Sequence, residues 1–163
     1  MNTENITLRK IEQKDNNAVK DIIEKVMTEF GAVGDGFSIM DPEVKSMFEN
    51  YSNTDSAYYV VEENGKVIGG AGIAPLNGGE KETCELKKMY VLPEARGKGI
   101  GKALMEVCLE AAKSLGYKFC YLETLSHMES ANILYQKYGF KLLPKSMGNT
   151  GHFGCNKWLM KEL

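Results

Sequence analysis

Glu85–Leu104 has the sequence ELKKMYVLPEARGKGIGKAL and carries more structural information than any other stretch of the chain. Its first part belongs to a strand predicted for Thr83–Leu92, which Pro93 stops. Its last part opens a helix with apolar residues at helical spacing, and Gly116 ends that helix. We therefore predict a strand, a glycine-rich turn and a long amphipathic helix. The residues expected on the buried face of the helix are Ile100, Leu104, Val107, Cys108, Ala111, Ala112 and Leu115.

The turn between this strand and helix, Arg96–Gly101 (RGKGIG), has the composition of an anion-binding site. Backbone N–H groups at a helix N-terminus are unpaired and attract phosphate, and glycines let the backbone approach such a ligand closely. A nucleotide P-loop does not fit, because Gly97 and Gly101 are one residue too close and Ala103 replaces its Ser or Thr. The dinucleotide fingerprint fails as well, since Lys102 stands where its third glycine should be.

The segment before the strand predicts two helices. Ile6–Ile11 is a predicted first strand, and apolar residues at helical spacing predict a helix between Asp15 as N-cap and Gly31 just past its end. Asp41-Pro42 is expected to open a second helix, with proline at the first helical position. The apolar face of this second helix would consist of Val44, Met47, Phe48 and Tyr51.

An antiparallel meander follows these helices. Asn64-Gly65 between apolar runs predicts a tight hairpin that joins strands at Ala57–Glu62 and Lys66–Ala74. Another turn, Pro75–Lys81, leads into the strand Thr83–Leu92.

The part of the chain after the long helix predicts a return to the sheet. Lys118–Thr124 is a predicted strand, parallel to the strand before the helix because a helical crossover joins them. Ser126–Glu129 has the form of a capping box and would open a short helix that Gly139 ends. Phe140–Leu143 and Asn156–Met160 are predicted closing strands. This order of elements predicts an α+β domain with a mixed sheet.

The composition of the chain argues against several classes of protein. A length of 163 residues predicts one domain, 1–163, and a formal net charge of −2 lacks the basic surface of most nucleic-acid-binding or membrane-surface proteins. The chain has no apolar run that resembles a signal peptide or a membrane span. Four cysteines without a CxxC pair, and only two histidines, argue against a structural metal site. We expect free thiols, a cytoplasmic location and no nucleic-acid or membrane partner.

Two segments resemble one known family. Arg96, Gly99 and Gly101 match the Arg/Gln-x-x-Gly-x-Gly/Ala pattern of the GNAT superfamily of acyl-CoA-dependent N-acyltransferases, and Glu85–Leu104 resembles that family's coenzyme-A-binding core. Ala131–Phe140 (ANILYQKYGF) resembles its second signature, a short helix ending in LYxxxGF. The resemblance implies a GNAT-like fold over nearly the whole chain. That fold has a mixed, mostly antiparallel sheet of about six to seven strands, four flanking helices and a splayed parallel strand pair.

The resemblance also implies how acetyl-CoA is held. Backbone groups along Met89–Val91 would pair with the pantetheine arm, and the amides of Gly97–Lys102 would hold the pyrophosphate. Asn132 would face the cofactor, and the hydroxyl of Tyr135 would lie near the thioester sulfur and protonate the leaving thiolate. The cofactor-binding residues expected on this basis are Met89, Tyr90, Val91, Arg96, Gly97, Lys98, Gly99, Ile100, Gly101, Lys102, Asn132 and Tyr135.

Acetyl transfer to an amine needs a base. An alkylammonium group has a pKa of about 10.4, so a side chain must take its proton, directly or through water. Glu85 is the first candidate, because a Glu at the matching strand position acts as base in the histone-acetylating branch of the family. Glu123, on the facing strand, is the alternative. Tyr135 and Glu85 are therefore the expected catalytic residues.

The sequence says less about the residues that would bind the acceptor. His152 and Cys155 in the segment TGHFGC are compatible with a Cys–His nucleophile, or with a loop that carries one buried thiol. In family members this loop and the region Phe30–Tyr51 bind the acceptor. The resemblance therefore implies substrate contacts from Phe30, Glu123 and His152.

The implied function is direct transfer of the acetyl group of acetyl-CoA to a primary amine of a small molecule, without a metal. Two alternatives stay open. One is acetylation of a protein N-terminus or lysine, and the other is a non-catalytic acyl-CoA-binding regulatory module, which would need neither Glu85 nor Tyr135. Since family members are often dimers, a homodimer is an open alternative to a monomer.

Overall fold

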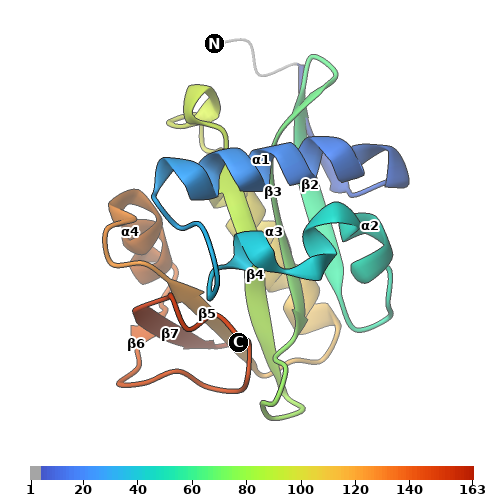
Figure 1. Cartoon of the computed structure of the whole chain (residues 1–163). Helices are drawn as coiled ribbons and strands as arrows, with labels where there is room; N and C mark the ends of the chain where they lie inside the picture. Colours follow the sequence, from blue (N-terminus) through green and yellow to red (C-terminus); the bar gives the residue numbers. More distant parts are fainter. Residues whose placement is uncertain (1–4) are drawn as a thin grey trace.

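One sheet of seven strands organises the computed structural model, which describes residues 5–163 (Figure 1). The strand order is β1-β2-β3-β4-β5-β7-β6, and every neighbouring pair is antiparallel except β4 and β5. The prediction of a mixed, mostly antiparallel sheet is confirmed. The strands are β1 (Ile6–Lys10), β2 (Ala57–Glu63), β3 (Lys66–Pro75), β4 (Thr83–Val91), β5 (Phe119–Thr124), β6 (Lys141–Leu142) and β7 (Lys157–Glu162).

Helices cover both faces of this sheet. The helices are α1 (Asn16–Glu29), α2 (Met47–Asn50), α3 (Ile100–Ser114) and α4 (Glu129–Lys137). Figure 1 shows α1 and α2 in front of the central strands and α3 behind them, with α4 beside β5. The face of α1 that meets the sheet repeats at helical spacing, from Val19 through Ile23 to Val26, and all three side chains are buried. No helix among residues 5–163 combines the length and apolarity needed to cross a membrane.

The segment predicted as a second helix is broken. Pro42 is the first residue of a 3-10 turn that ends at Lys45, and α2 begins only after Ser46, whose φ of −144° is not helical. The N–H of Phe48 donates to the side-chain oxygen of Asn16, at 2.8 Å, so a tertiary contact takes the place of a helical bond. The apolar residues Val44, Met47 and Tyr51 are nevertheless buried, as expected.

Two helix boundaries differ from expectation. The capping box predicted at Ser126–Glu129 does not form, because α4 begins at Glu129 with Met128 in the N-cap position and no side-chain cap. The N–H of Ser126 instead donates to Asn156, so a C-terminal residue fixes this loop. Leu115, expected on the buried face of the long helix, lies past the end of α3 and is 42% exposed.

The hairpin between β2 and β3 follows the prediction. Asn64 and Gly65 have φ values of 52° and 82°, and positive φ at both central residues is what a type I′ turn requires. This turn places β2 and β3 in antiparallel register next to β4.

The parallel pair separates soon after it forms. β4 and β5 are paired only from Thr83 opposite Phe119 to Glu85 opposite Tyr121, although both strands continue further. Beyond Glu85, the side of β4 that faces β5 is therefore open. The splayed parallel pair is confirmed, and the residues beyond the last pair form the walls of an opening in the sheet.

A bulge accompanies this separation. Between the pairs Gly70–Tyr90 and Gly72–Lys87, two residues of β4 oppose one residue of β3. One of them, Lys88, has a φ of 53°, and its carbonyl accepts a hydrogen bond from Tyr58 at 2.8 Å. A Cβ on Gly70 would lie 2.7 Å from the Tyr58 ring, so the glycine in β3 makes room for the side chain that fixes the bulge.

Candidate functional site

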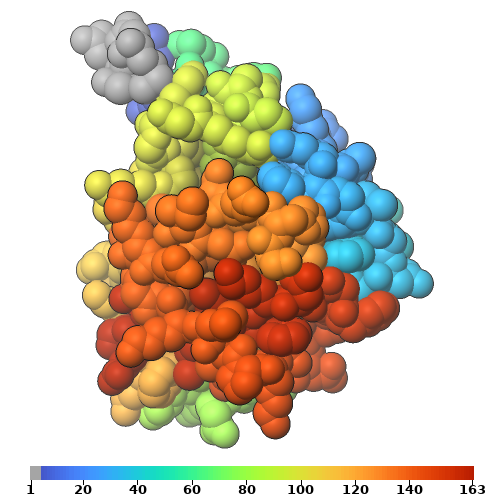
Figure 2. Space-filling view, turned by 90° about the vertical axis from the view of Figure 1, so that its left-hand side faces the viewer, coloured from blue at the N-terminus to red at the C-terminus, as the bar shows by residue number. Residues whose placement is uncertain are grey.

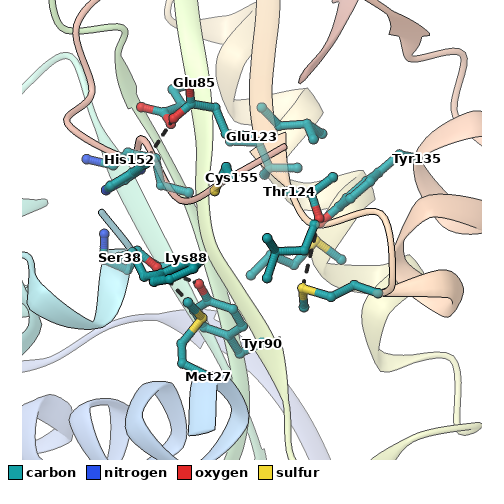
Figure 3. A pocket seen from close by; sticks show the side chains of 17 residues that line it. Met27, Ser38, Glu85, Lys88, Tyr90, Glu123, Thr124, Tyr135, His152 and Cys155 are labelled. Atoms are coloured by element: carbon teal, nitrogen blue, oxygen red, sulfur yellow. Dashed lines mark hydrogen bonds and ion pairs between the residues drawn. The ribbon is translucent and has the colours of Figure 1, made fainter. Parts of the chain in front are cut away.

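Two neighbouring cavities lie where β4 and β5 separate. The outer one, called the cleft here, has a volume of about 660 Å³ and lies between the end of β4, the start of α3 and α4. The inner pocket has a volume of about 60 Å³ and lies between β4 and β5 (Figure 3). Four residues contribute to the lining of both cavities, namely Met89, Tyr90, Met128 and Tyr135. Any ligand that reaches from one cavity to the other must pass these four side chains.

The glycine turn forms one wall of the cleft. Gly97 and Gly99 have φ values of 78° and 79°, and Gly99 is the N-cap of α3. The first N–H bonded within this helix is that of Ala103, which donates to Gly99, so the three preceding amides have no helical partner. A Cβ on Gly97 or Gly99 would meet no atom within 4 Å, so the space above the turn is open. This arrangement fits a phosphate group, which unpaired amides at a helix N-terminus bind.

Most of the expected cofactor-binding residues line the cleft. These are Met89, Tyr90, Val91, Arg96, Gly97, Gly99, Ile100, Gly101, Lys102 and Tyr135. The side chain of Lys98 instead forms an ion pair with Glu63, at 3.3 Å. Asn132 is buried, and its amide donates to the carbonyls of Leu125 and Met128, each at 3.0 Å. Asn132 thus fixes the loop before α4 and is not among the residues that line the cleft, while its side-chain oxygen is buried without a hydrogen-bond partner among residues 5–163.

Arg96 is held by the end of α1. Its guanidinium binds both carboxylate oxygens of Glu29, at 2.7 and 2.8 Å, and its Nε donates to the carbonyl of Val91. The same guanidinium lies 5.5 Å from the ring centre of Phe30, and the carbonyl of Phe30 bonds His127 at 2.8 Å. Phe30 was expected at the acceptor, but it lines the cleft and not the inner pocket.

Glu85 is a buried carboxylate in the inner pocket. Only 4% of the residue is exposed, and its carboxylate makes no hydrogen bond to any residue from 5 to 163. Burial raises the pKa of Glu85 to about 7, with a further rise from the nearby Glu123 and an opposing effect of Lys87. A carboxylate with this pKa exists in both protonation states near neutrality, which suits a general base.

Glu123, the alternative base, is held by donors. Its carboxylate accepts hydrogen bonds from Tyr121 at 2.6 Å and Thr150 at 2.5 Å, and it lies 3.4 Å from Nδ1 of His152. Burial alone would raise the pKa of Glu123, but the hydrogen bonds from His152, Thr150 and Tyr121 outweigh it and lower the pKa. Since these donors stabilise the ionised form, Glu85 is better suited than Glu123 to accept a proton near pH 7.

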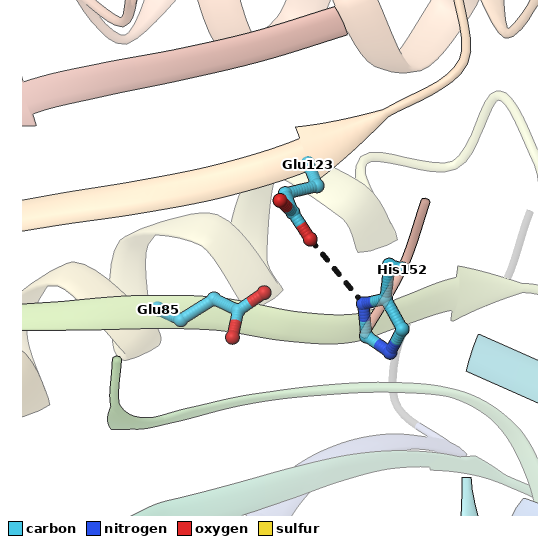
Figure 4. A group of neighbouring side chains, drawn as sticks. All are labelled: Glu85, Glu123 and His152. Atoms are coloured by element: carbon cyan, nitrogen blue, oxygen red, sulfur yellow. Dashed lines mark ion pairs between the residues drawn. The ribbon is translucent and has the colours of Figure 1, made fainter. Parts of the chain in front are cut away.

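His152 lies between two acidic side chains. Its Nε2 is 2.8 Å from Asp41, and its Nδ1 faces Glu123 (Figure 4). Burial opposes protonation, but the bonds to Asp41 and Glu123 raise the pKa of His152 to about 9. The contact with Asp41 could not be predicted from the sequence, in which Asp41 indicated only the start of a helix.

The Cys–His nucleophile is not supported. Cys155 lines the inner pocket, but the partners of the His152 ring are Asp41 and Glu123 rather than the thiol. Burial raises the pKa of Cys155 to about 12, with smaller contributions from the nearby carboxylates. A thiol of this kind stays protonated and unreactive at neutral pH.

Tyr135 lies across the inner pocket from Glu85 (Figure 3). The residue is 7% exposed, packs its ring edge-on against Phe140, and lines the cleft as well as the pocket. Burial raises the pKa of Tyr135 to about 12, and Cys155 adds to the effect. The hydroxyl therefore stays protonated and can donate a hydrogen bond to a ligand at the junction of the two cavities.

Two loops meet beside the inner pocket, and residues of both line it. Gly154 donates its N–H to the carbonyl of Gly36 at 2.8 Å, and each glycine lies against an aromatic ring of the other loop. A Cβ on Gly36 would be 2.5 Å from Phe153, and a Cβ on Gly154 would be 2.6 Å from Phe37. Figure 2 shows the blue α1–α2 segment and the red C-terminal loop in contact at the surface. The two loops are therefore interlocked rather than separated by a groove.

Comparisons with known proteins agree with this geometry. Residues 19–140 match the model of the acetyltransferase (GNAT) family. The uncharacterized N-acetyltransferase YjgM of Escherichia coli (strain K12) is 41% identical over 157 residues, which cover 96% of this chain and 94% of that protein.

Two solved structures share the fold. YncA of Salmonella typhimurium, solved with its cofactor acetyl-CoA, has a TM-score of 0.79 at 20% sequence identity, over 98% of this chain and 94% of that one. The PaiA N-acetyltransferase of Thermoplasma acidophilum, in complex with coenzyme A, has a TM-score of 0.74 at 20% identity, over 97% and 99% of the two chains.

Proposed function

Because the chain belongs to the GNAT family of acetyltransferases, we propose that it transfers the acetyl group of acetyl-CoA directly to a primary amine of a small molecule. The observation that carries this proposal is the position of Glu85, a buried residue whose carboxylate has no hydrogen-bonding partner among residues 5–163, in a pocket that shares four lining residues with the glycine-lined cleft. A non-catalytic acyl-CoA-binding module would need no such group. Bound acetyl-CoA supplies the activated acyl group.

The residues of the cleft would hold the cosubstrate. The unpaired amides at the start of α3 would bind the pyrophosphate, and the open side of β4 along Met89–Val91 would receive the pantetheine arm. The carbonyl of Val91 already accepts a bond from Arg96, which leaves Met89 as the freer pairing site. Tyr135, at the junction of the two cavities, would then lie near the thiol end of that arm.

Charge balance in the inner pocket favours an amine as acceptor. Glu43 pairs with Lys87, Asp41 pairs with Lys88, and Glu123 pairs with His152, which leaves Glu85 as the carboxylate without a cationic partner. An ammonium group would neutralise that charge and place its proton next to the base. Glu85 would accept the proton, and the neutral amine could then attack.

The surroundings of the inner pocket favour a small molecule. About 60 Å³ holds roughly four to six water-sized groups, so only the amine head group of an acceptor would enter the inner pocket. The interlocked loops around Gly36 and Gly154 occupy the surface that a peptide groove would need. We therefore favour a small-molecule acceptor over a protein N-terminus or lysine.

Thiol release from acetyl-CoA, measured with a panel of primary amines and with lysine-bearing and free-N-terminal peptides, tests this proposal. We expect release with at least one small amine and none above background with the peptides. Turnover with peptides alone would support protein acetylation. Tight binding of acetyl-CoA without turnover on any member of the panel would support the regulatory module.

Acetyl-CoA is expected to stabilise the native protein. A ligand at 100 times its Kd adds about 2.7 kcal/mol, which for a domain of this size raises Tm by about 5–10 °C. Thermal melts with acetyl-CoA, ATP and NADH measure the effect. A shift with NADH and none with acetyl-CoA would contradict the proposed cosubstrate.

Gly99→Ala should weaken coenzyme A binding by about 10- to 100-fold, equal to about 1.4–2.8 kcal/mol, because its Cβ would enter the space above the turn. Gly116→Ala is a matched control at the other end of α3. Gly116 has a φ of 89° and nothing within 4 Å of its Cβ position, so both variants bear similar backbone strain.

Calorimetric titration of each folded variant with coenzyme A measures the difference. The Gly116→Ala variant should keep the native affinity, since the site lies about 22 Å away along the helix. Native affinity in folded Gly99→Ala would mean that the phosphates bind elsewhere.

A further inference from the structure

Three potential metal ligands converge in the inner pocket. One carboxylate oxygen each of Glu85 and Glu123 and a ring nitrogen of His152 lie within 4.8 Å of one another (Figure 4). The side chains of Glu123 and His152 are 4% and 9% exposed, and the Glu85 residue is 4% exposed. Clusters of acidic groups at a protein surface are common without any metal, but these three are enclosed by the protein.

The unpartnered carboxylate of Glu85 indicates that this cluster can bind a ligand. Its carboxylate is more than nine-tenths buried, has no hydrogen-bond donor among residues 5–163, and faces the other two side chains (Figure 4). A buried carboxylate is costly unless a cation or donor accompanies it. The proposed acceptor amine would meet this need during turnover, and a metal ion could meet it between turnovers.

We propose that Glu85, Glu123 and Nδ1 of His152 form a Zn²⁺ site, and that the bound ion inhibits the enzyme by occupying the catalytic base. The claim of binding rests on the geometry of the three side chains alone. The claim of inhibition rests on the proposed function. The ion is an inhibitor in this proposal, and no step of acetyl transfer uses it.

The spacing of two ligands already suits zinc. Bonds of about 2.0–2.1 Å at a tetrahedral angle place two ligand atoms about 3.3 Å apart. The observed distance from Glu123 Oε1 to His152 Nδ1 is 3.4 Å. The oxygen of Glu85, within 4.8 Å of both, has to move by about 1–1.5 Å, which side-chain rotation supplies. The fourth tetrahedral position would then face the pocket.

The surroundings orient these ligands as they do in zinc proteins. A ligating histidine usually donates its other N–H to a carboxylate, and Nε2 of His152 lies 2.8 Å from Asp41. That contact keeps the proton on Nε2, and Zn²⁺ at Nδ1 would displace the proton that Nδ1 otherwise donates to Glu123. Glu123 is held in turn by the hydroxyls of Tyr121 and Thr150. A histidine with two carboxylates favours Zn²⁺ over Mg²⁺, which prefers six oxygen ligands.

Zinc uptake from a weak chromophoric chelator, measured on the full chain without coenzyme A or amine, tests the binding claim. We expect one Zn²⁺ per chain and no uptake of Mg²⁺. Glu85→Gln and His152→Asn should each weaken Zn²⁺ binding by at least about tenfold. Glu43→Gln is the matched control, because it makes the same chemical change in a neighbouring carboxylate that pairs with Lys87. It should keep the native affinity within about threefold.

The cysteines need a separate control, because thiols also bind zinc. Cys155→Ser changes the thiol that lines the same pocket and should leave Zn²⁺ affinity unchanged. With Co²⁺ as a probe, tetrahedral bands without a thiolate charge-transfer band are expected. A thiolate band, unchanged affinity in Glu85→Gln and His152→Asn, or no uptake by the wild-type chain would each overturn the site.

A final measurement separates binding from inhibition. Zn²⁺ should inhibit acetyl transfer in competition with the amine, and a chelator should restore the rate. Zinc binding in a chain that acetylates no amine would refute the proposed function and leave the site intact. Full activity with the site saturated by zinc would refute the inhibition.

Discussion

Glu85→Gln is expected to lower kcat/KM at neutral pH by about 10²–10⁴, the usual contribution of a positioned general base. The substitution keeps the shape of the side chain and removes its ability to accept a proton. Affinity for acetyl-CoA should change little, because Glu85 lines the inner pocket and not the cleft. Steady-state kinetics with the best amine of the panel, together with calorimetric binding of acetyl-CoA, measure both quantities.

The pH profile identifies the role of Glu85 more sharply than the rate. Since the pKa of Glu85 is about 7, the wild-type rate should rise with pH through that value as the carboxylate becomes ionised, and then level off. The variant should lose this step, and its rate should keep climbing toward the pKa of the amine, about 10.4 for an alkylamine. A native profile and rate in Glu85→Gln, with loss in Glu123→Gln, would assign the base to Glu123.

Stability against pH provides a control for folding. The pKa of Glu85 is raised in the folded state, so the folded protein binds more protons than the unfolded chain between the ordinary value of 4.5 and about 7. The contribution of Glu85 to stability is therefore fully present below pH 4.5 and is lost as the pH rises through 7. Glu85→Gln lacks this loss and should be at least as stable as the wild type at pH 8, so lower activity there cannot come from unfolding.

Tyr135→Phe is the second substitution with a large expected effect, a loss in kcat of about 10²–10³. The hydroxyl of Tyr135 lies where the cleft meets the inner pocket and remains protonated, with a pKa of about 12. A thiol has a pKa of about 8.5, so we expect Tyr135 to stabilise the departing thiolate by donating a hydrogen bond rather than by complete proton transfer. This refines the role of general acid implied by the family resemblance.

The two variants should differ in their pH profiles. Tyr135→Phe should keep the rise through pH 7, because Glu85 still accepts the amine proton, while the maximum rate falls. The ring of Tyr135 packs against Phe140, and phenylalanine preserves that contact. Single-turnover kinetics are the appropriate measurement, since slow product release would mask the effect. An unchanged single-turnover rate would reduce Tyr135 to a packing residue.

Local sequence signals predicted most of the fold. Asn64-Gly65 forms the expected hairpin, and Gly99 begins the expected helix in the left-handed conformation. These predictions were correct because turn-forming residues such as Asn and Gly favour particular φ and ψ angles, whatever the distant parts of the chain do. The single helix after Pro42 and the capping box at Ser126 were wrong for the opposite reason. Asn16 and Asn156 bond those segments from distant parts of the chain, and no local pattern reveals such partners.

The candidate site was predictable to a similar degree. The glycine turn, Glu85 and Tyr135 were identified from two motifs, and in the structure the glycine turn lines the cleft, Glu85 lines the inner pocket and Tyr135 lines both. The sequence did not reveal that Asp41 would hold His152 or that Lys88 would adopt a positive φ. Both features depend on contacts between residues that are far apart in the sequence. The carboxylate of Glu85 likewise has no hydrogen-bond donor in the part of the chain that the structure describes, because the polar side chains around it bond other residues, and the sequence does not reveal those bonds.

The short ladder between β4 and β5 also bears on aggregation. An unpaired strand edge at a protein surface invites pairing with another molecule, and proteins usually cover or shorten such edges. Here the open side of β4 is recessed between two parts of the same sheet, because the three-residue ladder holds β5 alongside. We expect this recess to exclude an extended polypeptide from another chain and to admit the more slender pantetheine arm. Such a recess would leave backbone donors and acceptors of β4 free for the cosubstrate without offering other chains a template for β-sheet growth.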